Sequence, residues 1–505
     1  MSAALTPLNC TLLALAALGA ATPAAAGSIT SFTAGDLVIE TVKNSTSLSN
    51  GAALDTASPM TLQEFSLSNS GTSANLVGTF TLPQTATGAN WAISGEYGSA
   101  SEGFLQLSGN NHLLTIMGYG VNANAFNSAP LSTYGTAALG QTTSVPGGSY
   151  TVVPRVVAAI GANGTVDTST AVLNFADQNN PRSAYTVDGS SFYVSGQASS
   201  KTDPTQGVQL VREGGSTGTI IYNQTDTRFV TVNNTLNDKN TLYVSGDYNP
   251  PGGGNQIYTG VVQLGSTGAL PTSAVPDPTH IVPPATPYSS GGNNGSINLT
   301  AATANGVNNS RINNFVYLSP EEYFFASPTV LYVADSGQPK NGNANKAALG
   351  EGGLQKWVLT STTGVWSLEY DLYQGLNLVN NANADPTHPT NPGVTGLFGL
   401  TGKVVGGQVE LFATSYGLNE LSPSYLYEIT DTLSATSGAG EVFTTLYSAP
   451  PDVSIRGVSF APTPGPILGQ GLASLGGLIA AGARAILARR RRPSALVPRR
   501  ASFER

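Results

Sequence analysis

One short pattern recurs along the chain and limits what it can fold into. A hydrophobic and aromatic run followed by small or acidic residues occurs at 191–196 (SFYVSG), 241–247 (TLYVSGD), 330–335 (VLYVAD) and 409–415 (VELFATS). Such runs, cut by Asn, Asp, Gly and Pro, indicate short strands joined by turns. A single small sheet leaves its faces uncovered, so repeated sheets must stack around an axis. The sequence therefore predicts an all-β fold, a β-propeller.

The composition supports one large β domain. Only 10% of the residues are charged, while Gly (59) and Pro (31) are abundant, which disfavours long amphipathic helices. A chain of 505 residues usually holds two or three domains, but repeat folds grow by adding units.

Dividing the chain into strand groups predicts six blades. The groups are 36–82 together with 456–461, then 103–175, 182–222, 228–299, 311–370 and 394–447. We expect 456–461 to pair with 36–42, because DLVIETV resembles the second strand of the other groups and closes the ring by main-chain hydrogen bonds. Seven blades are the alternative, since 103–175 can be divided at its long loop.

Two polar segments interrupt these groups. Residues 265–310 are rich in Pro, Gly, Asn and Ser and are expected to form a long loop insertion, and 377–393 form a second loop. Long loops on a rigid scaffold often carry function, and surface decoration is the alternative.

The N-terminus predicts export. Residues 1–26 have an apolar centre and end in Ala24-Ala25-Ala26, as in a secretory signal peptide. The only cysteine, Cys10, lies in this segment, so cleavage leaves no disulfide and no thiol nucleophile.

Charge argues against nucleic acid as a partner. Eight of the 21 basic residues lie after residue 483, where Glu504 is the only acid, so the rest of the chain holds 13 basic and 28 acidic residues. An acidic body repels phosphate backbones.

Few residues suggest catalysis, and we assign none. His112, His280 and His388 lack metal-ligand spacing, and Glu321 and Glu322 are strand neighbours that point to opposite faces. Acidic residues also stand at strand ends or turns, where turn capping and calcium ligation are the two interpretations. They are Asp167, Asp188, Asp247, Asp335 and Asp431.

Arginines recur near predicted strand starts and are the candidate ligand-binding residues. They are Arg182, Arg228, Arg311 and Arg456, with Arg155 at a different place in its group. Their forked donors could ring one end of a central channel and bind an anionic or sugar ligand. The alternative is that each arginine ties neighbouring blades together by hydrogen bonds to carbonyl groups.

The order of motifs resembles a group of bacterial exported β-propeller-like proteins that end in a PEP-CTERM-type sorting tail. The motifs are 35–42 (GDLVIETV), 62–67 (LQEFSL), 102–119 (EGFLQLSGNNHLLTIMGY), 164–172 (GTVDTSTAV), 180–196 (NPRSAYTVDGSSFYVSG), LYVSGD, LYVAD, LQKWVL and 456–464 (RGVSFAPTP). The resemblance implies a location and a fold for residues 27–462, and it supplies no catalytic residue.

The tail, residues 463–505, follows the same resemblance. Its sorting residues are Pro462, Pro464, Gly465 and Pro466, then Arg489, Arg490, Arg491 and Arg492. The apolar stretch 467–488 is long enough for a transmembrane helix, and the arginine cluster keeps that helix end cytoplasmic. Pro-Thr-Pro-Gly-Pro stands in place of the usual Pro-Glu-Pro. The implied partner is an exosortase-type protease, and an uncut single-pass anchor is the alternative.

These observations predict an exported protein of the cell surface or extracellular matrix, first membrane-anchored through 467–488, with a binding or structural role. Exopolysaccharide is a possible partner. The alternatives are an adhesin and a calcium-dependent propeller hydrolase acting on lactones or glycans. A binding or structural protein needs no cofactor, whereas the hydrolase would need calcium. We favour the binding or structural role over an enzymatic one.

The tail gives the first testable prediction. If the protease cuts near Pro464 to Pro466, mass spectrometry of the secreted protein should find no peptide from residue 467 onward. A secreted form that still carries those peptides would show that the tail is not processed.

Overall fold

The computed structural model describes residues 27–465, apart from 44–53, 69–70, 100, 201, 225, 236–239, 247–259, 283–295, 298–315, 338–351, 379–392 and 418–421. The expected signal peptide, the apolar stretch 467–488 and the arginine cluster therefore lie outside the described residues. Within those residues, no helix has the length and apolar character needed to cross a bilayer.

Strands make up nearly all the regular structure. The helices in the described ranges are the short α1 (Ala123–Ser128) and α2 (Leu131–Tyr134). Asn122 caps α1 by accepting a hydrogen bond from Ala125 N, and Gly135 ends α2 in a left-handed conformation at φ 79°. The prediction of an all-β fold is confirmed.

Four sheets each contain four consecutive antiparallel strands. The first has β10 (Pro181–Tyr185), β11 (Ser191–Gly196), β12 (Gly207–Arg212) and β13 (Thr219–Tyr222). The second has β14 (Thr227–Val232), β15 (Leu242–Gly246), β16 (Gly260–Leu264) and β17 (Thr279–Val282). The third has β20 (Pro320–Ser327), β21 (Val330–Asp335), β22 (Gly353–Thr360) and β23 (Val365–Leu372). The fourth has β24 (Val394–Val405), β25 (Gln408–Gly417), β26 (Tyr425–Thr432) and β27 (Thr444–Ser448).

A ten-stranded sheet holds both ends of the fold. One part runs in the order β28 (Val453–Phe460), β1 (Leu37–Lys43), β2 (Ala57–Ser68) and β3 (Ser73–Thr81). The other part contains β5 (Gln106–Leu107), β6 (Leu113–Tyr119), β7 (Arg155–Gly161), β8 (Val166–Asp167) and β9 (Ala171–Val172). The short β4 (Ser94–Glu96) pairs with both β2 and β6 and joins the two parts.

The last strand pairs with the first. In the antiparallel β1–β28 ladder, Leu37 lies opposite Phe460 and Lys43 lies opposite Val453. Ala461 N extends the ladder by donating a hydrogen bond to Asp36 O at 2.8 Å. The predicted pairing of 456–461 with 36–42 is confirmed, and the ladder also reaches back to Val453.

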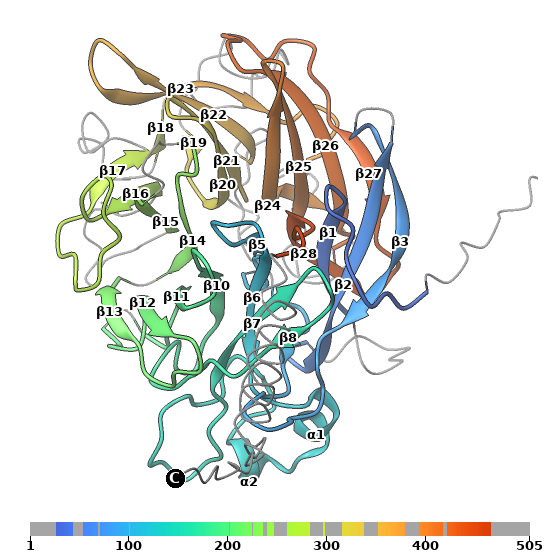
Figure 1. Ribbon diagram of the computed structural model, residues 1–505, viewed down its shortest axis with the longest axis vertical. Helices are drawn as coiled ribbons and strands as arrows, with labels where there is room; N and C mark the ends of the chain where they lie inside the picture. The colour runs from blue at the N-terminus through green and yellow to red at the C-terminus, as the bar shows by residue number, and fades with distance from the viewer. Residues whose placement is uncertain are drawn as a thin grey trace, which may run out of the picture.

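The first strands of the strand groups meet in a closed circuit of contacts. Strand β28 contacts β5, β5 contacts β10, and the circuit continues through β14, β20 and β24 back to β28. Figure 1 shows these strands facing the middle of the molecule, with the other strands of each group lying outward. Each of these first strands is called an inner strand below.

A glycine allows a close approach between β28 and the segment before β5. Gly457 on β28 donates its N–H to Gly103 O at 3.0 Å. A Cβ atom at Gly457 would lie 2.4 Å from that oxygen and 2.4 Å from Leu105 N. Both are backbone atoms, so the two backbones would have to move apart to accommodate a side chain. The absence of a side chain therefore lets β28 seat against the segment that precedes β5.

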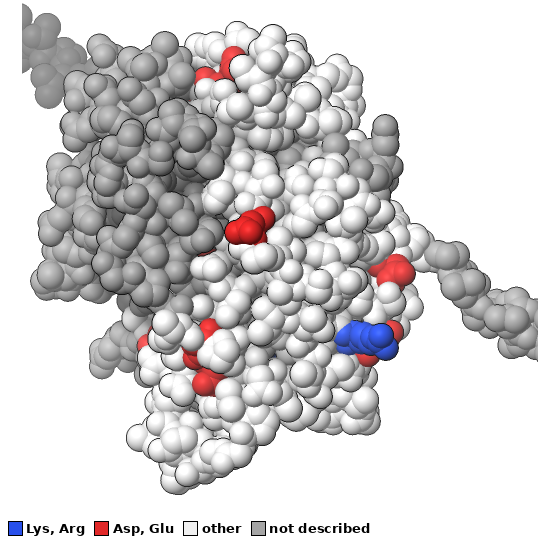
Figure 2. Space-filling model, turned by 90° about the vertical axis from the view of Figure 1, so that its left-hand side faces the viewer, with Lys and Arg blue, Asp and Glu red and all other residues white. Residues whose placement is uncertain are grey.

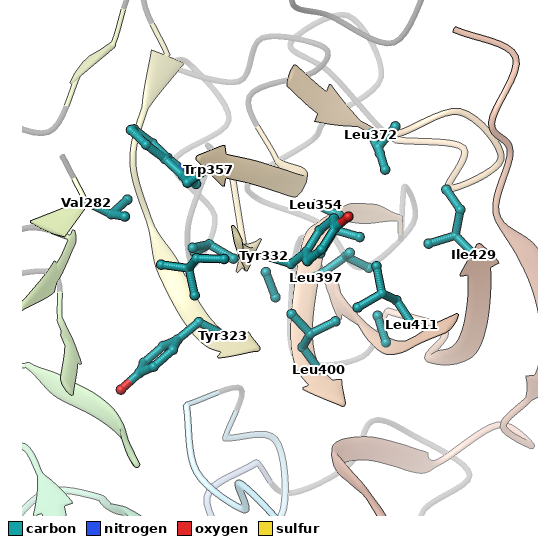
Figure 3. Close-up of a cluster of buried hydrophobic side chains, with 14 of the residues drawn as sticks. Val282, Tyr323, Tyr332, Leu354, Trp357, Leu372, Leu397, Leu400, Leu411 and Ile429 are labelled. Carbon is teal, nitrogen blue, oxygen red and sulfur yellow. The ribbon is translucent and has the colours of Figure 1, made fainter. Parts of the chain in front are cut away.

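Hydrophobic side chains fill the space between neighbouring sheets. Tyr332 and Leu354 from one sheet belong to the same buried cluster as Leu397 and Leu411 from the next, as Figure 3 shows. Trp357 is fully buried in this cluster. Burial of each such side chain contributes about 1.5–3 kcal/mol.

The expected insertion at 265–310 contains regular structure. Strand β17 is the fourth strand of its sheet, and β18 (Ser296–Ile297) pairs with β19 (Val316–Tyr317). Of the second expected loop, residues 379–392 lie outside the described residues.

Candidate functional site

Arg456 links three segments near the centre of the molecule. Its Nε and Nη2 donate to the two carboxylate oxygens of Glu40 on β1, both at 2.7 Å, and its Nη1 donates to Glu102 Oε1 at 2.5 Å. The Arg456 side chain is 2% exposed. Burial raises the pKa of Glu40, and the charge of Arg456 acts in the opposite direction. The guanidinium therefore ties both parts of the ten-stranded sheet to each other.

Arg228 and Arg182 make comparable links in other sheets. Arg228, on β14, is ion-paired with Glu321 on β20 and donates to Pro320 O at 3.2 Å. Arg182, on β10, is ion-paired with Asp226, just before β14, and donates to Gln197 Oε1 at 2.6 Å. Arg228 thus links its inner strand to the neighbouring sheet, and Arg182 links its inner strand to the turn that precedes β14.

Arg155 is buried as well but bonds mainly to carbonyl groups. It donates to Thr142 O at 2.8 Å and to Val153 O and Ala176 O at 2.9 Å. It lies on β7 rather than on an inner strand, so its place differs from that of the other arginines, as the sequence indicated.

The candidate ligand-binding arginines thus take their observed partners from the protein. Arg182, Arg228 and Arg456 are buried and engaged by carboxylates, and Arg311 lies outside the described residues. These contacts link neighbouring sheets, as in the alternative that each arginine ties neighbouring blades together. The main partners are carboxylates, where that alternative expected carbonyl groups. Ligand binding by these arginines stays a prediction.

Aromatic rings fill the centre beside the arginines. Phe104 stacks on Phe398 with ring centroids 4.3 Å apart and contacts Phe229 at 5.7 Å. Phe229 meets the edge of Tyr323 at 5.4 Å. Phe398 also lines a small cavity of about 30 Å³ beside Arg456, which has room for about one water molecule. Phe229 and Tyr323 instead line a larger cavity.

The larger cavity, called the central cavity below, has a volume of about 190 Å³. Residues from five inner strands line it, together with neighbouring turn residues. The lining residues used below are Gln106, Asn111, Phe229, Thr231, Asn234, Glu322, Tyr323, Phe324, Phe325, Leu400 and Phe460. The concave space at the meeting point of several elements makes it the candidate functional site.

Glu322 is the one carboxyl group that the described residues contribute to this lining. Its side chain is 2% exposed, and its Oε2 accepts a hydrogen bond from Leu400 N at 2.9 Å. Burial raises the pKa of Glu322 well above its usual range and thereby favours the protonated form of this carboxyl group in the folded protein. A neutral carboxyl group carries one O–H donor.

Gln106 presents the complementary group. Its residue is 5% exposed, and its Nε2 donates to Ala184 O at 3.0 Å and to Val230 O at 2.9 Å. These two bonds hold the amide between β10 and β14. Its Oε1 is buried and accepts no hydrogen bond within the described part of the chain. An acceptor of this kind is completed by a ligand or water.

Sequence reasoning recognised Glu322 but assigned it no role. Glu321 and Glu322 do point to opposite faces, because Glu321 meets Arg228 on β14 while Glu322 meets Leu400 on β24. Nothing in the sequence was a reason to select Gln106, because the two carbonyl groups that orient its side chain lie 78 and 124 residues away in the chain. An acidic residue in a hydrophobic strand was the one signal available for Glu322.

The aspartates proposed at turns or for calcium have several roles. Asp167 accepts from Ser169 N at 2.7 Å and Asp188 from Ser190 N at 3.0 Å, so both cap turns. Asp335 accepts from Gly337 N at 2.8 Å. Asp431 differs, since its Oδ2 accepts from the hydroxyl groups of two buried tyrosines at 2.5 and 2.6 Å and lies 3.1 Å from a buried lysine. Asp247 lies outside the described residues.

No cluster of three or more His, Cys, Asp or Glu side chains suited to a metal occurs among the residues that the structure describes. His112 Nδ1 lies 3.2 Å from Thr463 O, and burial lowers the pKa of His280 on β17. His388 lies outside the described residues.

The last described residues lie beside the central cavity. Thr463 N donates to Asn111 O at 2.8 Å, and Asn111 lines the cavity. Pro462, Pro464 and Gly465 of the expected sorting motif lie in this segment, and Pro466 is the first residue past the described part.

Comparisons place no family on this chain, since no family model and no curated protein matches it. Similar solved structures include oligogalacturonate lyase from Vibrio parahaemolyticus, 9% identical with a TM-score of 0.35, covering 81% of this chain and 98% of that one. The β-propeller domain of the Trilobed protease from Pyrococcus furiosus is 7% identical with a TM-score of 0.27, covering 82% and 86%. CoXyl43, a GH43 β-xylosidase/α-arabinofuranosidase from a compost metagenome, is 10% identical with a TM-score of 0.30, covering 73% and 99%. At these TM-scores the likeness carries no argument about activity.

Burial of Glu322 gives a pH-dependent prediction. Below about pH 4.5 the group is protonated in both the folded and the unfolded chain, so Glu322→Gln and the native protein should differ by a constant amount. At higher pH the unfolded chain ionises first, so the native protein should lose stability relative to Glu322→Gln by up to about 1.4 kcal/mol per pH unit. Urea unfolding across this range measures the gap.

Glu213→Gln, at an exposed turn, gives the baseline for removing one carboxyl group. If the free energy of unfolding of the native protein, relative to that of Glu322→Gln, stayed constant or increased with rising pH, the raised pKa of a buried Glu322 would be contradicted.

Proposed function

We propose that this protein is a six-bladed β-propeller exported to the cell surface or extracellular matrix, where it binds a ligand in the central cavity. The blade count is supported by the circuit of inner strands β28, β5, β10, β14, β20 and β24, each the first strand of one strand group. The pairing of β28 with β1 supports closure through the chain ends.

The single observation that carries the binding role is the central cavity. Five inner strands contribute to it, and it contains a buried carboxyl group and a buried amide oxygen that finds no donor among the described residues. Burying such polar groups costs stability unless they gain partners. The unpaired amide oxygen of Gln106 is retained at this cost most simply because a ligand supplies its missing donor.

Export rests on the two chain ends. Residues 1–26 have the form of a secretory signal peptide, and 463–505 have a proline motif, an apolar stretch and an arginine cluster in the order of a sorting tail. Among the described residues on the face shown in Figure 2, most of the surface is neutral, with a few acidic side chains and little basic surface, which suits contact with uncharged surface material.

The binding role is tested at the mouth of the central cavity. Asn234 is an exposed turn residue that lines the cavity, so Asn234→Trp should obstruct entry with little effect on folding. The probe is extracellular polymer from cells that lack this protein, and the measurement is the amount of purified full chain that it retains. We expect retention to fall about tenfold or more.

Thr362→Trp is the matched control, because Thr362 is an exposed turn residue between β22 and β23, outside the cavity lining. Equal retention of both variants and the native protein would overturn the role of the central cavity. Calcium-dependent hydrolysis of a lactone or glycan panel would favour the hydrolase alternative instead.

A further inference from the structure

We propose that the central cavity takes one neutral sugar unit, the terminal residue of an uncharged glycan. This inference rests on the proposed binding role of the cavity and names its ligand class. It is carried by the charge, hydrogen-bonding capacity, wall chemistry and size of the cavity.

Charge excludes ionic ligands first. Among the described residues the lining contains no Lys, Arg or His side chain, so an anionic ligand such as a uronate would enter without a countercharge from them. A cationic ligand would need Glu322 to give up its proton in a site where burial opposes ionisation. A neutral ligand meets neither cost.

The hydrogen-bonding groups then favour hydroxyl groups. The Oε2 of Glu322 already accepts from Leu400 N, so the protonated form that burial favours has an O–H group to donate, while Gln106 Oε1 has no donor among the described residues. A hydroxyl group is both donor and acceptor, so a polyhydroxylated ligand can satisfy both residues. An amide or ketone alone supplies fewer of these groups per unit of volume.

The walls favour a ring with apolar faces. Phe229, Tyr323, Phe324, Phe325 and Phe460 all contribute to the lining. Pockets of this kind combine apolar and aromatic walls with a few polar groups that fix orientation. A sugar ring presents C–H groups on its faces and hydroxyl groups at its rim, which matches aromatic walls with polar groups between them.

Size limits the ligand to one unit. A volume of about 190 Å³ is below the roughly 300–1,000 Å³ of pockets for drug-sized ligands. It corresponds to about six water molecules in the liquid. Asn111 and Asn234 stand at exposed positions of the lining, so further units of a glycan would extend outward past neutral amides.

The test is calorimetric titration of the purified full chain with glucose, galactose, mannose and N-acetylglucosamine, and with galacturonate and glucosamine as charged counterparts. We expect at least one neutral sugar to bind about tenfold more tightly than either charged sugar. Glu322→Gln should retain this affinity within about twofold, because glutamine keeps an acceptor for Leu400 N and a donor for the ligand. Glu322→Leu and Gln106→Met should each weaken binding about tenfold or more.

The variants Glu322→Leu and Gln106→Met change buried residues and could misfold. Asn234→Trp and Thr362→Trp change exposed residues and therefore test the cavity without that risk. The first should lose sugar binding and the second should keep it. Tighter binding of a charged sugar, no binding of any neutral sugar, or binding that Asn234→Trp leaves unchanged would overturn the inference. If Asn234→Trp still abolishes retention on extracellular polymer, the proposed binding role survives that failure and only the ligand class is wrong.

Discussion

The fold depends on joining its two chain ends. The antiparallel ladder of β28 and β1 brings residues more than 400 positions apart into register, and Arg456 fastens the same junction by binding Glu40 and Glu102. The ladder holds the two strands of one sheet, whereas the guanidinium reaches into the second part of that sheet. Removing one member of such a buried cluster leaves uncompensated charge and costs about 3–5 kcal/mol. Main-chain pairing and buried charge therefore stabilise the same junction between β28 and β1, called the seam below. Both keep the circuit of inner strands closed.

A closed circuit of inner strands creates a centre that must be filled. Arginine and carboxylate groups occupy one part, the stacked rings of Phe104 and Phe398 occupy the next, and the central cavity lies beyond Phe229. In a chain with 10% charged residues, the charged groups near the centre neutralise one another. The cavity is left with neutral donors and acceptors, and its proposed preference for an uncharged ligand follows from that arrangement.

Local patterns predicted the strands well, because alternating hydrophobic runs and turn residues act within a few positions of each other. The pairing of the chain ends was predictable too, since DLVIETV resembles the second strand of the other groups and the C-terminal run resembles the first. The partners of the arginines were not predictable, because Arg228 meets Glu321 only after 93 residues of intervening chain are folded. The central cavity was missed for the same reason: Gln106 and Glu322 reach it from different sheets, and no sequence motif assigns a role to either residue.

The closure is tested most directly by a disulfide across the seam. Lys43 and Val453 face each other at the end of the β1–β28 ladder, and Cys10, the only native cysteine, can be replaced by serine. In the Lys43→Cys, Val453→Cys protein, mild oxidation should form the disulfide in nearly all molecules and stabilise the fold by about 2–4 kcal/mol. The control pair Lys43→Cys, Val365→Cys joins β1 to an exposed position on β23, in a different sheet, and should stay reduced. A seam pair that oxidises no faster than this control would contradict a fold closed by its own ends.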